Sequence, residues 1–130
     1  MNPNDLFATD AAAAALGIEF IDGGPGHTEL AMTVTTAMLN IADTCHGGVL
    51  FTLADSAMQI TSNAGEAVAF ASTANMHYIA PARSGDRLTA SVGERLRRGK
   101  VTYHTGTIMG PHGVVALFDG TTIDVAVEST

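Results

Sequence analysis

Apolar and polar residues alternate along the segment from His27 to Thr35, a pattern typical of a strand with one buried face. Glycines and a proline at positions 23–26 precede this segment and indicate a turn before it. One set of alternate positions is Thr28, Leu30, Met32 and Val34, and the other is His27, Glu29, Ala31 and Thr33.

After this strand the apolar residues recur at the wider spacing of a helix, and this pattern predicts a single long helix from about Gly47 to Ala64. Its apolar residues spread around most of the circumference, so most of the helix should be buried. The remaining positions form a stripe of short polar residues without any Lys, Arg or Glu before Glu66: Thr52, Asp55, Ser56 and Gln59. An ordinary solvent-facing side would normally carry long charged residues, so we favour a pocket wall or an interface.

The remaining elements are one short helix and four strands. Residues 10–16 form an Ala-rich helix with Asp10 as N-cap and Gly17 at its end. After the long helix, strands are predicted over Ala67–Ile79, Arg87–Arg97, Val101–Met109 and Val114–Val127, the last with a bulge at Gly120. In the second of these, Leu88, Ala90, Val92 and Leu96 should point inward. The expected class is α+β, with five antiparallel strands wrapped around one central helix.

Composition limits the class of protein. At 130 residues the chain fits one domain, residues 1–130, and its hydrophobic content of 46% excludes general disorder. It contains no long uncharged apolar run and no signal-peptide pattern, and Cys45 is its only cysteine. We therefore expect a cytoplasmic protein without a membrane span or a disulfide framework.

The charge of the chain is uneven. A net charge of −7 argues against a general nucleic-acid or membrane surface. All six basic residues lie in the second half, and four fall within six positions: Arg95, Arg97, Arg98 and Lys100. This cluster fits an anionic ligand such as a phosphate, or a solvated hairpin tip whose charges deter edge pairing.

The most informative stretch for chemistry runs from Asn40 through His46-Gly47-Gly48 into the long helix. Glycine lets another molecule approach the backbone closely, and the first N–H groups of a helix lack intrahelical partners. Such a site suits a carbonyl oxygen that becomes negative during a reaction, with Asp55 as base or nucleophile.

The spacing of Gly47 and Asp55 predicts an assembly. Eight helical residues rise about 12 Å, so one carbonyl cannot contact both groups of the same helix. If both act together, Asp55 must come from a second chain whose helix runs antiparallel to the first. We therefore expect a homodimer with shared sites. A homotetramer is expected as the complete assembly, although the helix spacing does not bear on this second step.

These residues resemble a known family. The segments Asp10–Ile18, Met32–Thr35, Met38–Asn40, Cys45–Gly48 and Leu53–Asp55 are similar to those of the hotdog-fold, phenylacetic-acid-degradation (PaaI-type) acyl-CoA thioesterases, and so are Pro81, Gly85-Asp86, Leu88–Ala90 and Val115–Phe118. The resemblance implies hydrolysis of acyl-CoA without a metal or organic cofactor. Ile41 and Asp119 depart from it, because relatives commonly carry glycine and a basic residue there.

The resemblance also implies roles for individual residues. Gly47 would donate its backbone N–H to the thioester oxygen with His46 beside it, and Asn40 would orient the thioester through its side chain. Asp55 would activate water or attack directly, and Thr73 would place a hydroxyl near the attacking water. Arg95, Arg97, Arg98 and Lys100 are candidates for contact with the CoA phosphates.

Other chemistries are less well supported. A Cys45 thiolate nucleophile is disfavoured because Cys45 and His46 are adjacent and diverge in direction. The five histidines lack metal-ligand spacing, and Gly93–Lys100 does not match a phosphate-binding loop. A non-catalytic acyl-CoA-binding module and a hotdog hydratase stay open as alternatives. The acyl group could be aryl-acetyl, hydroxyaryl-acetyl or medium-chain.

Overall fold

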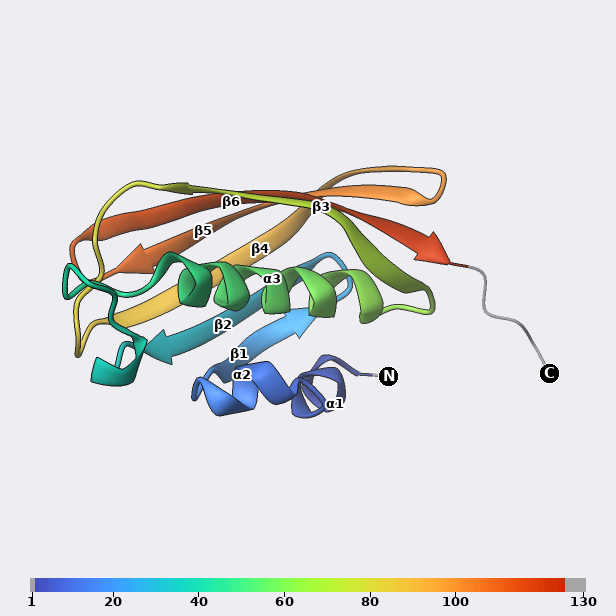
Figure 1. The fold of residues 1–130 in the computed structure, drawn as a ribbon. Helices are drawn as coiled ribbons and strands as arrows, with labels where there is room; N and C mark the ends of the chain where they lie inside the picture. Colours follow the sequence, from blue (N-terminus) through green and yellow to red (C-terminus); the bar gives the residue numbers. More distant parts are fainter. Residues whose placement is uncertain (1, 126–130) are drawn as a thin grey trace.

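A curved antiparallel sheet wraps around one long helix (Figure 1). The computed structural model describes residues 2–125. The six strands lie in the order β1-β2-β4-β5-β6-β3, so strands distant in sequence become neighbours. The helices are α1 (Pro3–Ala8), α2 (Ala11–Ala15) and α3 (Gly47–Asn63), with a short 3₁₀ turn at Thr36–Met38; the strands are β1 (Glu19–Gly24), β2 (His27–Thr33), β3 (Val68–Tyr78), β4 (Arg87–Arg98), β5 (Val101–Gly110) and β6 (Gly113–Val125).

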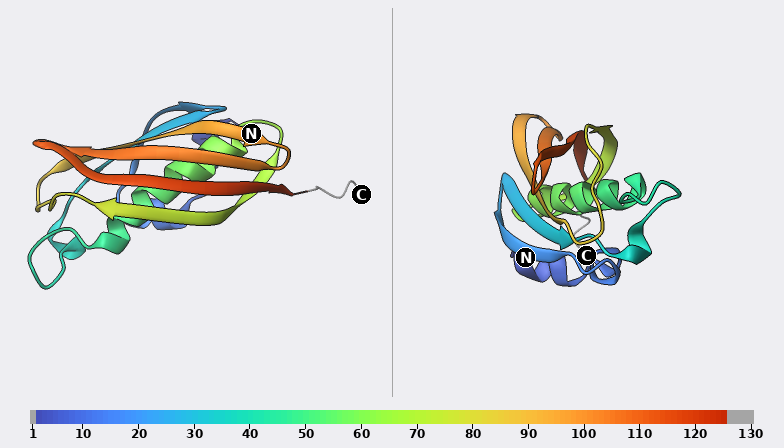
Figure 2. Two further views of the ribbon diagram at one scale, coloured as in Figure 1. Left: turned by 90° about the horizontal axis from the view of Figure 1, so that it is seen from above. Right: turned by 90° about the vertical axis from the view of Figure 1, so that its left-hand side faces the viewer.

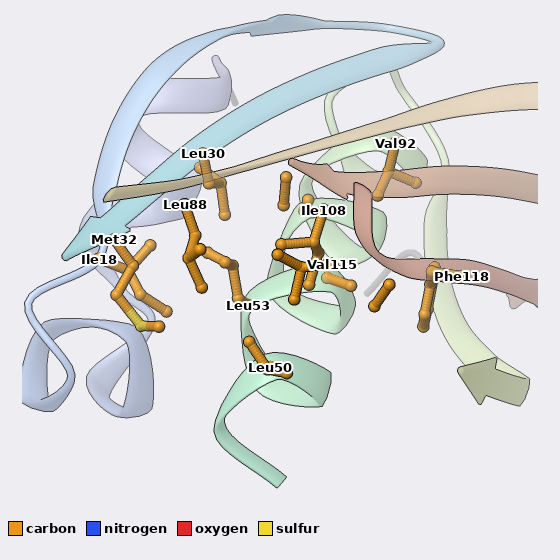
Figure 3. Close-up of a cluster of buried hydrophobic side chains, with 14 of the residues drawn as sticks. Ile18, Leu30, Met32, Leu50, Leu53, Leu88, Val92, Ile108, Val115 and Phe118 are labelled. Atoms are coloured by element: carbon orange, nitrogen blue, oxygen red, sulfur yellow. The ribbon is translucent and has the colours of Figure 1, made fainter. Parts of the chain in front are cut away.

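Helix α3 is embedded in the concave side of the sheet, which confirms the predicted central helix. Leu53, Ala57 and Met58 of α3 are fully buried, and the sheet supplies Leu30, Leu88, Val92 and Ile108 against them (Figure 3). The sheet approaches closely at Gly120, where an added Cβ would lie 2.7 Å from the Met58 sulfur. Removal of this apolar surface from water stabilises the helix in its position.

Within residues 2–125 the sheet has six strands, so the prediction of five was wrong. The additional strand, β1, pairs with β2, and the register shifts between Phe20 and Asp22. Its sequence lacks a regular alternation and ends in two glycines, so no period of two marks it. Helix α1 was also missed, although Asn2 accepts a hydrogen bond from the Asp5 N–H and Pro3 opens the helix.

Bulges alter which side chains point inward. Leu96 was expected in the core, but it is exposed, because the β4–β5 register shifts between Glu94 and Leu96. Gly120 pairs regularly with both neighbouring strands, so the bulge predicted there is absent. The shift in β6 occurs near Val115 instead. Val127, the predicted end of that strand, lies outside the described residues.

The two N-terminal helices pack against α3 on the side away from the sheet (Figure 2). Asp10 connects them to α3 through both of its carboxylate oxygens. One oxygen accepts the Ala13 N–H at 3.0 Å, as predicted for an N-cap, and the other accepts the Ser56 hydroxyl at 2.7 Å. Ser56 is consequently buried, and together with Gln59 of the predicted polar stripe it lines a small cleft.

Buried polar side chains gather around the C-terminal half of α3. His104 of β5 is fully buried, and its Nε2 lies 2.9 Å from the Thr122 hydroxyl. Its Nδ1 has no hydrogen-bond partner among the described residues. Burial lowers the pKa of His104 below the ordinary value of 6.5, although Glu94 opposes this shift.

This histidine predicts a loss of stability in acid. Below pH 6.5 the unfolded chain binds a proton at position 104 that the folded chain does not, so the free energy of unfolding should fall by up to about 1.4 kcal/mol per pH unit. Urea denaturation between pH 5 and 8 measures it, and His104→Gln should have a shallower pH dependence. The exposed His112→Gln is the matched control. Equal slopes for wild type and His104→Gln would contradict the prediction.

Candidate active site

The loop before α3 is organised by the side chain of Asn40. Its Oδ1 accepts the N–H groups of Ala42 at 2.9 Å and Thr44 at 3.2 Å, and its amide nitrogen donates to the Thr44 hydroxyl at 3.0 Å. The turn places Asp43 at φ 59°, a left-handed conformation that aspartate tolerates better than a β-branched residue. The β-branched Ile41 has a negative φ, and its side chain is fully exposed. Asn40 thus holds the loop together, a role that its sequence position did not reveal.

Helix α3 begins with one backbone N–H that is not used within the fold. The Gly48 N–H donates to Nδ1 of His46 at 3.1 Å, and the N–H groups of Val49 and Leu50 donate to the His46 carbonyl. His46 is therefore the N-cap, and its ring hydrogen is on Nε2 in this arrangement. Among the described residues the Gly47 N–H has no partner, so it can donate to a ligand.

Tyr78, at the end of β3, covers the first turn of α3. Its hydroxyl donates to the Gly47 carbonyl at 3.0 Å. A Cβ on Gly47 would lie 3.0 Å from the ring carbon Cζ and from the hydroxyl oxygen, so any larger residue would push the Tyr78 ring away by a few tenths of an ångström. The sequence analysis did not identify Tyr78 as a site residue, because its contact with Gly47 joins residues 31 positions apart.

An open cleft of about 390 Å³ lies beside these groups. Burial raises the pKa of the Cys45 thiol in its wall to about 11, so this thiol is protonated at neutral pH and is a poor nucleophile. The structure thus brings Asn40 and Gly47 together around one opening, next to His46. The lining residues are Asn40, Thr44, Cys45, Gly47, Leu50, Tyr78, Ile79, Ala80, Pro81 and Ala82.

Asp55 lies farther along α3 and does not line this cleft. It is half-buried, with Thr52 and Gln59 on the same exposed side of the helix. Burial raises the pKa of Asp55 above its ordinary value of 3.8, and the nearby Asp10 carboxylate adds to this effect. A hydrogen bond with Gln59 opposes it. A carboxylate with a raised pKa is a better proton acceptor than one in free solution.

A second, smaller cleft of about 160 Å³ lies between α1 and α3, close to Asp55 along the helix. Its walls combine aliphatic side chains with a few polar groups. The lining residues are Leu6, Thr9, Asp10, Ser56, Gln59, Ile60 and Asn63.

Thr73 is not brought to either cleft. Its neighbours Ala74 and Met76 pack toward the core, and Thr73 lies on the opposite face of the sheet. Its hydroxyl is 2.7 Å from that of Thr121 and also accepts the Thr121 N–H. The structure therefore gives Thr73 a role in strand pairing within this chain.

The basic cluster lies at the opposite end of the molecule from the start of α3, where β4 turns into β5 (Figure 1). Arg97 is engaged in an ion pair with Asp124 and donates to the Thr102 hydroxyl at 3.0 Å. Arg98 and Lys100 are exposed near the turn, and Arg95 lies on the outer face of the sheet. The four residues therefore do not form one uniform patch.

Within residues 2–125, no helix combines the length and the hydrophobicity that a membrane span requires. Within the same residues, no three His, Cys, Asp or Glu side chains are grouped as metal ligands would be.

A curved antiparallel sheet around a single long helix is the hotdog fold, and a free N–H beside a cleft suits acyl-group chemistry. The profile of the family described as "Thioesterase superfamily" matches residues 42–107. The chain belongs to this superfamily and is a hotdog-fold acyl-CoA thioesterase homologue of the PaaI type.

Individual relatives agree with this assignment. The chain is 39% identical over 121 residues to the acyl-coenzyme A thioesterase PaaI of Escherichia coli, covering 92% of this chain and 86% of that protein. The solved structure of E. coli PaaI, from the phenylacetic acid degradation operon, superimposes with a TM-score of 0.93 at 35% identity, over 99% of this chain and 94% of that chain. A variant of the phenylacetic acid degradation protein PaaI of Thermus thermophilus gives a TM-score of 0.86 at 31% identity, over 89% of this chain and 100% of that chain. The predicted family and fold class are thus confirmed.

Proposed function

We propose that this protein hydrolyses acyl-CoA thioesters with the Gly47 N–H as oxyanion donor and Asp55 as base or nucleophile. The observation that carries the proposal is the single unpartnered N–H at the start of α3, beside a cleft that also exposes Asn40. A preorganised donor of this kind stabilises the charge that develops on the thioester oxygen. Asn40 retains one amide hydrogen beyond its bond to Thr44, and this hydrogen orients the thioester.

The chemistry has two routes that use the same groups. In one, Asp55 takes a proton from water, and the water oxygen attacks the thioester carbon. The tetrahedral intermediate then breaks its C–S bond, and the CoA thiolate receives the proton from Asp55. In the other route, the Asp55 carboxylate attacks directly, CoA leaves, and water hydrolyses the resulting anhydride.

Each site requires two chains. Helix α3 is continuous from Gly47 to Asn63, so Gly47 and Asp55 are separated by about 12 Å along one axis. Strand β3 is eleven residues long, forms an edge of the sheet and carries neither Lys nor Pro to block pairing. Pairing of two β3 edges about a two-fold axis would place the α3 helices antiparallel and bring Asp55 of one chain to Gly47 of the other.

A homotetramer is consistent with the outer face of the sheet. Large apolar side chains are exposed there on strands β3 to β6, and an apolar surface of this kind is typical of a contact region. These residues are Phe70, Leu96, Val101, Leu117 and Ile123.

The smaller cleft near Asp55 is a candidate for the acyl group. A volume of about 160 Å³ accommodates one ring or a short chain, because an apolar cavity of about 150 Å³ is known to hold benzene. This size supports aryl-acetyl or hydroxyaryl-acetyl groups over medium-chain acyl groups. Relative kcat/KM values for phenylacetyl-CoA and decanoyl-CoA test this preference.

Lys100 and Arg98 are the candidates for contact with the CoA phosphates. Within one chain they lie at the far end from Gly47 (Figure 1). A two-fold axis that makes the α3 helices antiparallel would bring this turn of one chain toward the α3 start of the other. Arg97 is a weaker candidate, because its charge is balanced by the ion pair with Asp124 within the chain.

The role of Asp55 is tested by Asp55→Asn, which keeps the size of the side chain and removes its charge. Turnover, followed by thiol release without added metal, should fall by about 10²- to 10⁴-fold. The wild-type rate should fall in acid as Asp55 becomes protonated, with a midpoint above pH 3.8, because its pKa is raised. Asp119→Asn is the control. Near-full turnover by Asp55→Asn would instead favour a non-catalytic acyl-CoA-binding module.

The shared site is tested by mixing two inactive variants under conditions that allow subunit exchange. Asn40→Asp preserves the oxygen that accepts the Ala42 and Thr44 N–H groups but removes the donor, so the loop should remain folded. When Asn40→Asp chains are mixed with Asp55→Asn chains, the mixed dimers have both substitutions in one site, and their other site is wild type. Random pairing then restores roughly a quarter of wild-type activity. No recovery, with mixed dimers confirmed by mass spectrometry, would refute a shared site.

The phosphate contact is tested by Lys100→Glu. This variant should raise KM for an acyl-CoA more than for the matching acyl-pantetheine, which lacks the nucleotide. Added salt should reduce the difference between wild type and variant, because exposed charges are screened. Equal effects on both substrates would show that Lys100 does not recognise the nucleotide.

A further inference from the structure

The two glycines at the start of α3 form a peptide group that is held from both ends. Its N–H, on Gly48, donates to Nδ1 of His46, and its carbonyl, on Gly47, accepts the hydroxyl of Tyr78. Glycine restricts its own backbone less than any other residue does. The orientation of this peptide therefore depends on these two side chains in addition to the helix itself.

The neighbouring peptide carries the free N–H of Gly47. Its carbonyl, on His46, accepts two hydrogen bonds, from Val49 at 3.0 Å and from Leu50 at 3.3 Å. Hydrogen bonds to a carbonyl polarise its peptide group and strengthen the donor at the other end. The two peptides meet at the Cα of Gly47, so a displacement of this atom, when the Gly47–Gly48 peptide loses an anchor, would also displace the free N–H.

Tyr78 is well suited to prevent this displacement, because it contacts Gly47 with both its hydroxyl and its ring. Its strand pairs with β6 at Ala116, and the next two N–H groups, of Ile79 and Ala80, both donate to the Val115 carbonyl. The phenol is thus attached to the sheet, whereas His46 belongs to the loop that it caps. The ring also fills the space in which a side chain at position 47 would lie.

We infer that Tyr78 is a positioning residue for the oxyanion site, and that its hydroxyl fixes the Gly47–Gly48 peptide so that the Gly47 N–H points at the thioester oxygen. The inference rests on the proposed function. Preorganised donors lower the barrier because they need no reorientation as charge develops.

The test is Tyr78→Phe, which keeps the ring against Gly47 and removes only the hydroxyl. We expect kcat to fall about 2- to 10-fold, as for the loss of one hydrogen bond, with KM changed less than twofold. Tyr103→Phe is the matched control, since Tyr103 is the only other tyrosine and is exposed on the outer face. An unchanged kcat, or a raised KM with unchanged kcat, would overturn the inference.

A second measurement does not depend on turnover. Amide hydrogen exchange of Gly48, followed by NMR, should be faster in Tyr78→Phe than in wild type and Tyr103→Phe, because the peptide loses one of its two side-chain partners. Unchanged exchange would overturn the inference even in a protein without hydrolytic activity. An inactive wild type with accelerated Gly48 exchange in Tyr78→Phe would refute the proposed function but support the positioning role.

Discussion

An α-helix leaves its first four N–H groups without intrahelical partners, and the candidate site depends on how α3 satisfies them. Three of them have partners outside the helical pattern: the His46 N–H donates to the Met38 carbonyl, the Gly48 N–H to the His46 imidazole and the Val49 N–H to the His46 carbonyl. The fourth, on Gly47, faces a cleft rather than the interior of the fold. Since a buried N–H without a partner would destabilise the fold, this donor is tolerated because water or a ligand can reach it. The site is therefore created by one incomplete cap.

The rest of the fold fixes the position of α3, and so also the position of its N-terminal cap beside the cleft. The curved sheet encloses the apolar side of the helix, and Gly120 allows contact with Met58. On the side away from the sheet, Asp10 links the N-terminal helices to Ser56. Asp55 lies on the remaining surface, half-buried next to these groups, and this location accounts for its raised pKa. Packing, rather than a dedicated catalytic loop, sets the environment of the carboxylate.

Sequence periodicity predicted the elements that have a regular pattern. The strand near His27 and the helix near Gly47 were found because one face of each is continuously apolar. Strand β1 and the bulge at Arg95 were missed, since neither leaves a periodic signal. At the site, glycines beside a helix start predicted Gly47, and an isolated carboxylate suggested Asp55. The contact of Tyr78 could not be predicted, because it depends on how the end of β3 meets the start of α3.

The position of Tyr78 on an edge strand has a consequence for assembly. β3 has one strand neighbour, β6, and the Asn63 side chain bonds the backbone N–H and carbonyl of Ala69 near the start of the strand, so the stretch after Ala69 is available to pair. A second chain that pairs with this edge would restrain the same strand that carries the phenol. Association and ordering of the first turn of α3 would then be linked equilibria, and each would strengthen the other. With a site shared between two chains, a dissociated chain would lose the Asp55 that the other chain contributes and also part of the rigidity at the start of its own α3, so dilution alone would lower the activity of each chain.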